Sequence, residues 1–119
     1  MLLLAQAAVA LVLLVHVYIV LLETVFFDTR GRRVFGLSAD KAAIVKPAMS
    51  NQGCYNGFLV AALAVGLVHS DPAVASAFVH YGLLCVAVAG IWGGLTVSRR
   101  IIFVQTVPAI AALLLYQFR

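Results

Sequence analysis

Charged residues are confined to a few short segments of the chain, and four long stretches between them carry none. These stretches cover residues 1–22, 47–70, 72–98 and 101–118. Each is close to the roughly 20 residues with which an α-helix crosses a hydrocarbon core about 30 Å thick. The stretches are continuously apolar, so they lack the alternating pattern of membrane barrel strands. The pattern predicts an all-α fold: one domain, residues 1–119, forming a four-helix transmembrane bundle with spans at about 2–22, 50–68, 73–97 and 101–118.

The composition agrees with this interpretation and leaves no length for a separate soluble domain. Hydrophobic residues make up 65% of the chain and charged residues 10%, against roughly 25% charged residues in an ordinary globular domain. The mean hydropathy is +1.12. The first apolar stretch lacks a basic segment before it and is longer than the apolar part of a typical signal peptide. We therefore expect it to be a retained helix.

The positions of the basic residues predict how the bundle is oriented. Seven of the eight lie in two loops, between spans one and two and between spans three and four: Arg30, Arg32, Arg33, Lys41, Lys46, Arg99 and Arg100. Loops rich in Lys and Arg stay in the cytoplasm. We therefore expect a multi-pass protein of the plasma (inner) membrane with both termini outside. The net charge of +4 is explained by this topology and by anionic headgroups, so no nucleic-acid partner is expected.

Two local signals refine the predicted helices. Ser38 followed by Asp40 is typical of a helix start, which predicts a short interfacial helix over residues 39–45. Pro47 would end this helix or begin the next. Pro108 lies inside the fourth span, where it is expected to kink the helix and free a backbone carbonyl near Val104.

Polar side chains inside the spans gather toward the predicted cytoplasmic end. Span one carries His16, roughly 10 Å from the inner boundary at 1.5 Å per residue, and ends at Glu23. The candidate ligand-binding residues from the other spans and their ends are Asn51, Gln52, Tyr55, Asn56, Thr96, Ser98, Arg99 and Gln105. Because polar groups in spans avoid lipid, they predict a polar pocket open to the inner side. The alternative is that these groups only hold the helices together.

His16 and Glu23 are the candidate catalytic pair. An imidazole in a low-dielectric site acts as acid or base near neutral pH, and a nearby carboxylate would orient it. Alternatively, Glu23 pairs with Arg99 or Arg100 at the interface. Cys54 and Cys85 lie at different depths, which argues against a disulfide, and two separated thiols are too few for a metal site. No metal or cofactor is expected.

Several motifs spread over nearly the whole chain resemble an uncharacterised family of integral membrane proteins, catalogued as domain of unknown function 1304. The matching segments are His16-Val-Tyr-Ile-Val-Leu-Leu-Glu23, Gly31-Arg-Arg-Val-Phe-Gly-Leu37, Asn51-Gln-Gly-Cys-Tyr-Asn-Gly-Phe58, Gly90-Ile-Trp-Gly93, Thr96-Val-Ser-Arg-Arg-Ile101, Val104-Gln105 and Pro108-Ala109. The resemblance implies a small four-span protein and assigns no reaction. Its motifs coincide with the predicted pocket.

Three functions remain open from the sequence. The first is binding of a lipid or small amphiphile in the polar pocket, with proton-transfer chemistry by His16 and Glu23 as an extension. The second is transport by a homo-oligomer, although Glu23 lies at a helix end and the one-sided charge argues against dual-topology dimers. The third is an accessory subunit of a larger membrane complex.

Overall fold

The computed structural model describes residues 1–119 and contains helices and turns but no strands, which confirms the predicted all-α class. The four main helices are α1 (Leu2–Glu23), α3 (Ala39–Val68), α4 (Pro72–Thr96) and α5 (Val107–Gln117). A π-helical turn, η1 (Phe27–Gly31), and a single turn, α2 (Arg32–Val34), connect α1 to α3. A second π-helical turn, η2 (Ile102–Thr106), runs directly into α5.

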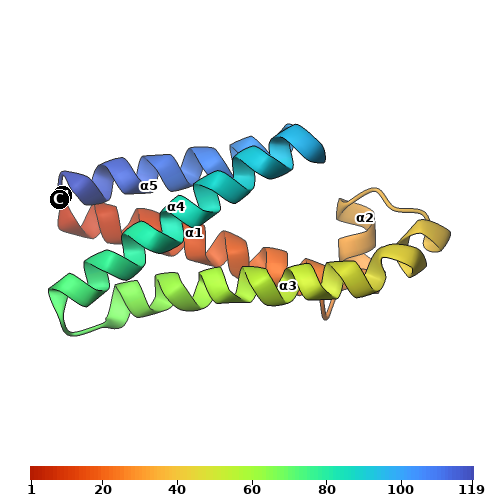
Figure 1. The fold of residues 1–119 in the computed structure, drawn as a ribbon, viewed down its shortest axis with the longest axis horizontal. Helices are drawn as coiled ribbons and strands as arrows, with labels where there is room; N and C mark the ends of the chain where they lie inside the picture. Colours follow the sequence, from red (N-terminus) through yellow and green to blue (C-terminus); the bar gives the residue numbers. More distant parts are fainter.

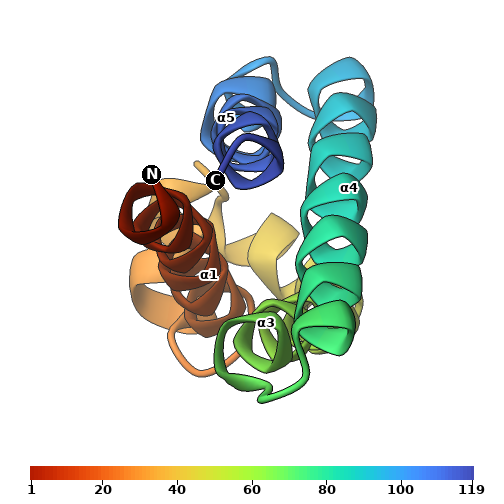
Figure 2. The same ribbon diagram turned by 90° about the vertical axis from the view of Figure 1, so that its left-hand side faces the viewer.

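The helices form an elongated bundle of 47 × 25 × 18 Å. Viewed along its length, α1 lies between α3 and α5, and α4 packs on both α3 and α5 to close the ring (Figure 2). Both chain termini lie at one end of the bundle, whereas η1 and α2 lie at the other (Figure 1). We call these the terminal end and the basic end. The basic end also holds the connection from α4 to η2, so the segments rich in Lys and Arg lie together.

The predicted short helix over residues 39–45 is not separate, and this prediction was wrong. Its residues are the first turns of α3, which continues for 30 residues through Pro47. Ser38 caps α3 as expected, and its hydroxyl accepts a hydrogen bond from the Lys41 N–H at 3.2 Å. Pro47 removes one backbone donor, but it neither ends nor begins the helix. The irregular turns occur earlier, where a Cβ at Gly31 would lie 2.0 Å from the Leu22 carbonyl oxygen.

The turn between α3 and α4 is tight and capped, as the sequence predicts. The Asp71 side chain accepts hydrogen bonds from the Ala73 N–H at 2.8 Å and the Val74 N–H at 3.3 Å. Pro72 occupies the first helical position, where its missing N–H costs nothing. The two helices are therefore antiparallel neighbours that start side by side and then move apart toward the basic end (Figure 1).

The predicted irregularity before Pro108 is present as the π turn η2. The Val107 N–H donates to the Ile102 carbonyl, a bond one residue wider than in an α-helix. Pro108 has no N–H to offer the Val104 carbonyl, so regular α-helical bonding is interrupted there. The turn places Thr106 against α4, where its hydroxyl donates to the Ala87 carbonyl at 3.0 Å.

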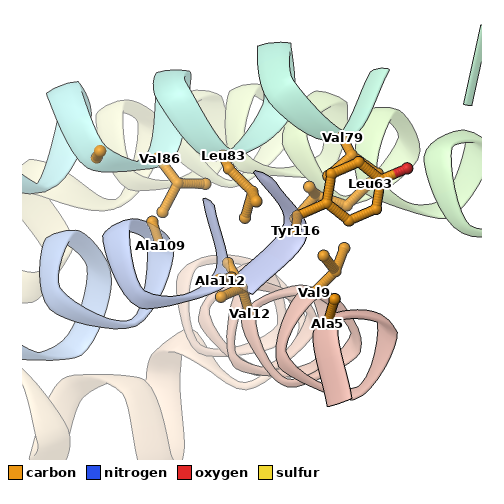
Figure 3. Packing of buried hydrophobic residues seen from close by; sticks show 11 residues of the cluster. Ala5, Val9, Val12, Leu63, Val79, Leu83, Val86, Ala109, Ala112 and Tyr116 are labelled. Carbon is orange, nitrogen blue, oxygen red and sulfur yellow. The ribbon is translucent and has the colours of Figure 1, made fainter. Parts of the chain in front are cut away.

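The apolar core takes its α1 residues only from the half of that helix toward the terminal end, and its side chains point toward one another between the helices (Figure 3). Its 11 residues come from all four helices: Ala5, Val9 and Val12; Leu63; Val79, Leu83, Val86 and Ala87; Ala109, Ala112 and Tyr116. Large apolar side chains also cover the outside, among them Leu3 at 82% and Leu14 at 62% exposed. Three helices, α1, α3 and α4, are long and apolar enough to cross a membrane, and the apolar helix Ile102–Gln117 is shorter.

Candidate functional site

A buried polar contact between Glu23 and Asn56 lies next to the apolar core, on its basic-end side. The Asn56 amide nitrogen lies 2.9 Å from one Glu23 carboxylate oxygen and 3.2 Å from the other. Glu23 is 5% exposed and Asn56 6%. The contact joins the end of α1 to the middle of α3. The hydrogen bond connects the two helices directly, and it leaves further lone pairs of the carboxyl oxygens unused.

Gly53 allows α1 and α3 to approach closely enough for Glu23 and Asn56 to form this contact. It lies one turn before Asn56 on α3 and is buried against the end of α1. A Cβ at this position would lie 2.5 Å from Thr24 Cγ2 and 3.3 Å from Glu23 Cβ. Small residues allow helix backbones to approach closely. The glycine therefore brings the Glu23 carboxylate within reach of the Asn56 amide.

His16 is fully buried and bonds to its own helix. Its Nδ1 lies 2.9 Å from the Val12 carbonyl oxygen, so this nitrogen carries the proton and Nε2 is an acceptor. Nε2 is buried without a hydrogen-bond partner in the protein. The Val12 carbonyl, rather than Glu23, orients the imidazole. The structure thus gives His16 and Glu23 separate partners.

An open groove of about 310 Å³ lies between α3 and α4, in the region where the two helices move apart (Figure 1). Its lining comes from both helices: Gln52, Tyr55, Asn56, Phe58, Leu59, Tyr81, Cys85 and Ala89. Three of the predicted ligand-binding residues, Gln52, Tyr55 and Asn56, contribute to it. Asn56 therefore belongs both to the groove and to the buried contact with Glu23.

The remaining predicted site residues lie outside this groove. Asn51, Thr96, Ser98 and Arg99 are exposed. The Thr96 hydroxyl donates to the Trp92 carbonyl of its own helix at 2.7 Å. Gln105 is half-buried in η2 beside Gly90, whose added Cβ would lie 2.9 Å from Gln105 Cβ. The residues that were predicted to share one pocket because of their similar depth in the membrane are thus distributed around the bundle.

The charged side chains at the basic end do not form the ion pair between Glu23 and Arg99 or Arg100 that the sequence left open as an alternative. The ion pair in the structure joins Lys46 to Asp28 at 2.5 Å, and both side chains are exposed. Glu23 pairs with neither Arg99 nor Arg100, so that alternative was wrong. Arg30 instead contacts α1, where its Nε donates to the Tyr18 hydroxyl at 2.5 Å and its guanidinium lies 5.6 Å from the ring centroid.

Sequence reasoning missed the α4 side of the groove. Tyr81, Cys85 and Ala89 are four residues apart, so they share one face of α4. This spacing is a usable signal, but Cys85 and Ala89 are small and apolar and do not stand out in a chain of this composition. Cys54 and Cys85 are both free thiols, and only Cys85 lines the groove.

Comparison with known families identifies the chain. The family model described as "Protein of unknown function (DUF1304)" matches residues 10–117, and the chain belongs to this family. The match includes α1 from its third turn onward and all of α5, so every element of the site lies within it. Searches of curated proteins and of solved structures each found no match.

Proposed function

We propose that this protein crosses the plasma membrane four times and binds a lipid or other small amphiphile in the groove between α3 and α4. The observation that carries the proposal is the groove itself, which combines three polar side chains from α3 with an apolar wall from both helices. Binding sites for small molecules typically have a mostly apolar lining with a few polar groups that fix orientation.

The membrane part of the proposal is supported by helix length and by the distribution of apolar and basic residues. Three helices are long and apolar enough to span a bilayer, and apolar side chains such as Leu95 and Val88 point outward at 77% and 63% exposure. Lipid would cover these surfaces. Seven of the eight basic residues belong to η1, α2, the first turns of α3 and the α4–η2 connection. These segments lie at the end opposite the termini (Figure 1), which favours a cytoplasmic basic end and outer termini.

The order of residues along the groove suits an amphiphile. On α3 the polar Gln52 and Asn56 lie nearer the basic end, and Leu59 lies beyond them toward the apolar core. A ligand that enters from the inner leaflet would place its polar group beside Gln52 and Asn56 and its chain along the apolar wall. The groove is open along its side, so such a chain would extend into the lipid.

Binding is better supported than proton-transfer catalysis. His16 does not line the groove, and its Nε2 is sealed inside the bundle. Glu23 approaches the groove only through Asn56, which it contacts at 2.9 Å. A general acid or base must lie within about 3.2 Å of the proton that it transfers, or one water away. Neither predicted catalytic residue meets this condition from the groove.

Protection of Cys85 from alkylation tests the proposal directly. Two single-cysteine proteins, Cys54→Ser and Cys85→Ser, are reconstituted and treated with a membrane-permeant maleimide in the presence of extracted membrane lipids or only of a detergent without hydrogen-bond donors. The lipids should slow labelling of Cys85 severalfold and leave Cys54, which lies outside the groove, unchanged. Equal labelling of Cys85 in both conditions would contradict the proposal.

A groove-filling substitution provides the matched structural control. Ala89→Phe places a ring in the groove, whereas Ala61→Phe adds the same ring at another exposed alanine, on α3 outside the lining. Native mass spectrometry of the purified proteins should show retained lipid in the wild type and in Ala61→Phe. Ala89→Phe should lose most of it. Equal retention by the two variants would place lipid elsewhere on the protein.

A further inference from the structure

Asn56 is the single residue that connects the buried carboxylate of Glu23 to the groove, and the direction of its amide determines what the groove recognises. Both Glu23 oxygens lie within 3.2 Å of the Asn56 Nδ2. In both of these contacts Nδ2 is the donor and a carboxyl oxygen of Glu23 is the acceptor. The Asn56 NH₂ group therefore faces Glu23, and the amide oxygen, Oδ1, is turned away from it.

The Asn56 oxygen is unpartnered and accessible. The hydrogen bonds of the Asn56 side chain are the two to Glu23, both through Nδ2. The one sealed polar side-chain atom without a partner is His16 Nε2, so Asn56 Oδ1 is not closed off. Because Asn56 lines the groove, its oxygen offers the groove an acceptor. Donation from Nδ2 to the Glu23 carboxyl group polarises the amide and strengthens Oδ1 as an acceptor.

The position of Asn56 restricts the headgroup further. Asn56 lies ten residues beyond Lys46 on the same helix, which is about 15 Å along the axis at 1.5 Å per residue. Lys46 and Asp28 are exposed and mark the charged level of the basic end. A phosphate bound beside Asn56 would lie well below that level and close to the Glu23 carboxylate. Both desolvation and repulsion disfavour it.

We infer that the groove takes an amphiphile whose headgroup is a hydrogen-bond donor without phosphate, a hydroxyl or a primary ammonium, bound to Asn56 Oδ1. The inference rests on the proposed amphiphile-binding function and names its ligand class. Glu23 is a positioning residue in this site, because it acts on the ligand through the orientation and polarisation of Asn56.

Two pairs of probes test the donor requirement without any substitution. Hexadecanol is compared with its methyl ether, and hexadecylamine with hexadecyltrimethylammonium, by the concentration that half-protects Cys85 in the Cys54→Ser protein. Each pair keeps the chain and the charge and removes the donors. The donor-bearing probe should protect at roughly tenfold lower concentration, since the hydrogen bond to Asn56 Oδ1 is lost in its partner. The pair with the larger ratio shows whether the natural donor is the hydroxyl or the ammonium.

Substitutions of the contact then test the role of Glu23. Glu23→Gln leaves Asn56 free to turn either end of its amide to the groove, so the preference for donors should fall to about twofold or less. The double substitution Glu23→Gln with Asn56→Asp exchanges the two groups, and the new carboxylate again presents an acceptor to the groove. It should restore the preference, which a purely structural role for Glu23 would not do. Helical circular dichroism and a single elution peak verify folding.

The outcomes separate the inference from the function on which it rests. Equal protection of Cys85 by both members of each pair would overturn the donor inference while amphiphile binding stands. Loss of the preference in Glu23→Gln without restoration in the double variant would remove the positioning role. If no probe protects Cys85 and Ala89→Phe changes nothing, the groove is not a binding site and the proposed function itself fails.

Discussion

The Asn56 amide donates to both carboxylate oxygens of Glu23, and the two residues are 33 positions apart in the chain. The contact joins the end of α1 to the middle of α3, in a region that the apolar core does not reach. Both residues are almost fully buried. Removing one partner of such a contact leaves the other desolvated, which costs more than the contact itself contributes.

We therefore expect Asn56→Leu to lower the free energy of unfolding by about 2 kcal/mol, because it leaves the Glu23 carboxylate buried without a donor. Glu23→Gln should cost less, about 1 kcal/mol or below, since the new amide can hydrogen-bond Asn56 in either orientation. Reversible unfolding of the purified protein in mixed micelles of dodecylmaltoside and dodecyl sulfate measures both values. Equal and small effects would show that the contact contributes little.

The close approach of α1 and α3 predicts opposite effects of one substitution at two neighbouring glycines. Gly53→Ala places a Cβ 2.5 Å from Thr24 Cγ2, whereas Gly57→Ala meets nothing within 4 Å. Gly53→Ala should destabilise the protein by about 1–3 kcal/mol through overpacking. Gly57→Ala should be neutral or stabilise it by up to about 1 kcal/mol, as alanine favours the helix. The same micelle unfolding distinguishes them, and equal losses would contradict the packing described.

The heights of the polar residues along the bundle could be predicted from the sequence, but their directions could not. The basic segments between spans one and two and between spans three and four define depth, and the predicted residues Gln52 and Asn56 do line a groove. The side of a helix on which a residue lies is normally predicted from the contrast between a polar and an apolar face. Here both the core and the outer surface are apolar, so Thr96 and Gln105 could not be assigned to a face.

The start of α3 shows a second limit of the sequence pattern. Ser38 was recognised as a cap because its side chain bonds a backbone N–H locally. The continuity of α3 through Pro47 was not predictable in the same way, because proline usually interrupts a helix. Pro47 removes one backbone hydrogen bond, and α3, which packs against both α1 and α4, nevertheless stays continuous. The groove lining on α4 was missed because small apolar residues carry no distinct signal.

The junction of α4 and η2 should be as sensitive to added volume as that of α1 and α3. A Cβ at Gly90 would lie 2.2 Å from Thr106 Oγ1 and 2.8 Å from the Thr106 backbone nitrogen. We expect Gly90→Ala to cost about 2 kcal/mol. Adding Thr106→Ala should recover only part of this loss, because the backbone nitrogen remains in the way. Full recovery in the double variant would show that the hydroxyl alone makes the contact tight.

His16 gives the clearest contrast between packing and polarity. Its side chain is 0% exposed, Nδ1 bonds the Val12 carbonyl, and Nε2 has no partner. His16→Leu keeps most of the volume and removes the unsatisfied acceptor, so it should be neutral or stabilise the protein by up to about 2 kcal/mol. His16→Ala leaves a cavity and should cost about 2–4 kcal/mol.

Micelle unfolding of the two His16 variants checks this contrast, with amphiphile protection of Cys85 measured in parallel. Because His16 does not line the groove, amphiphiles should protect Cys85 in His16→Leu at the same concentrations as in the wild type. If His16→Leu is more stable than the wild type, the buried imidazole with its unsatisfied Nε2 serves a purpose other than folding. If His16→Leu instead destabilises the bundle as much as His16→Ala, Nε2 makes a stabilising hydrogen bond in the membrane, and the imidazole belongs to the packing of the bundle.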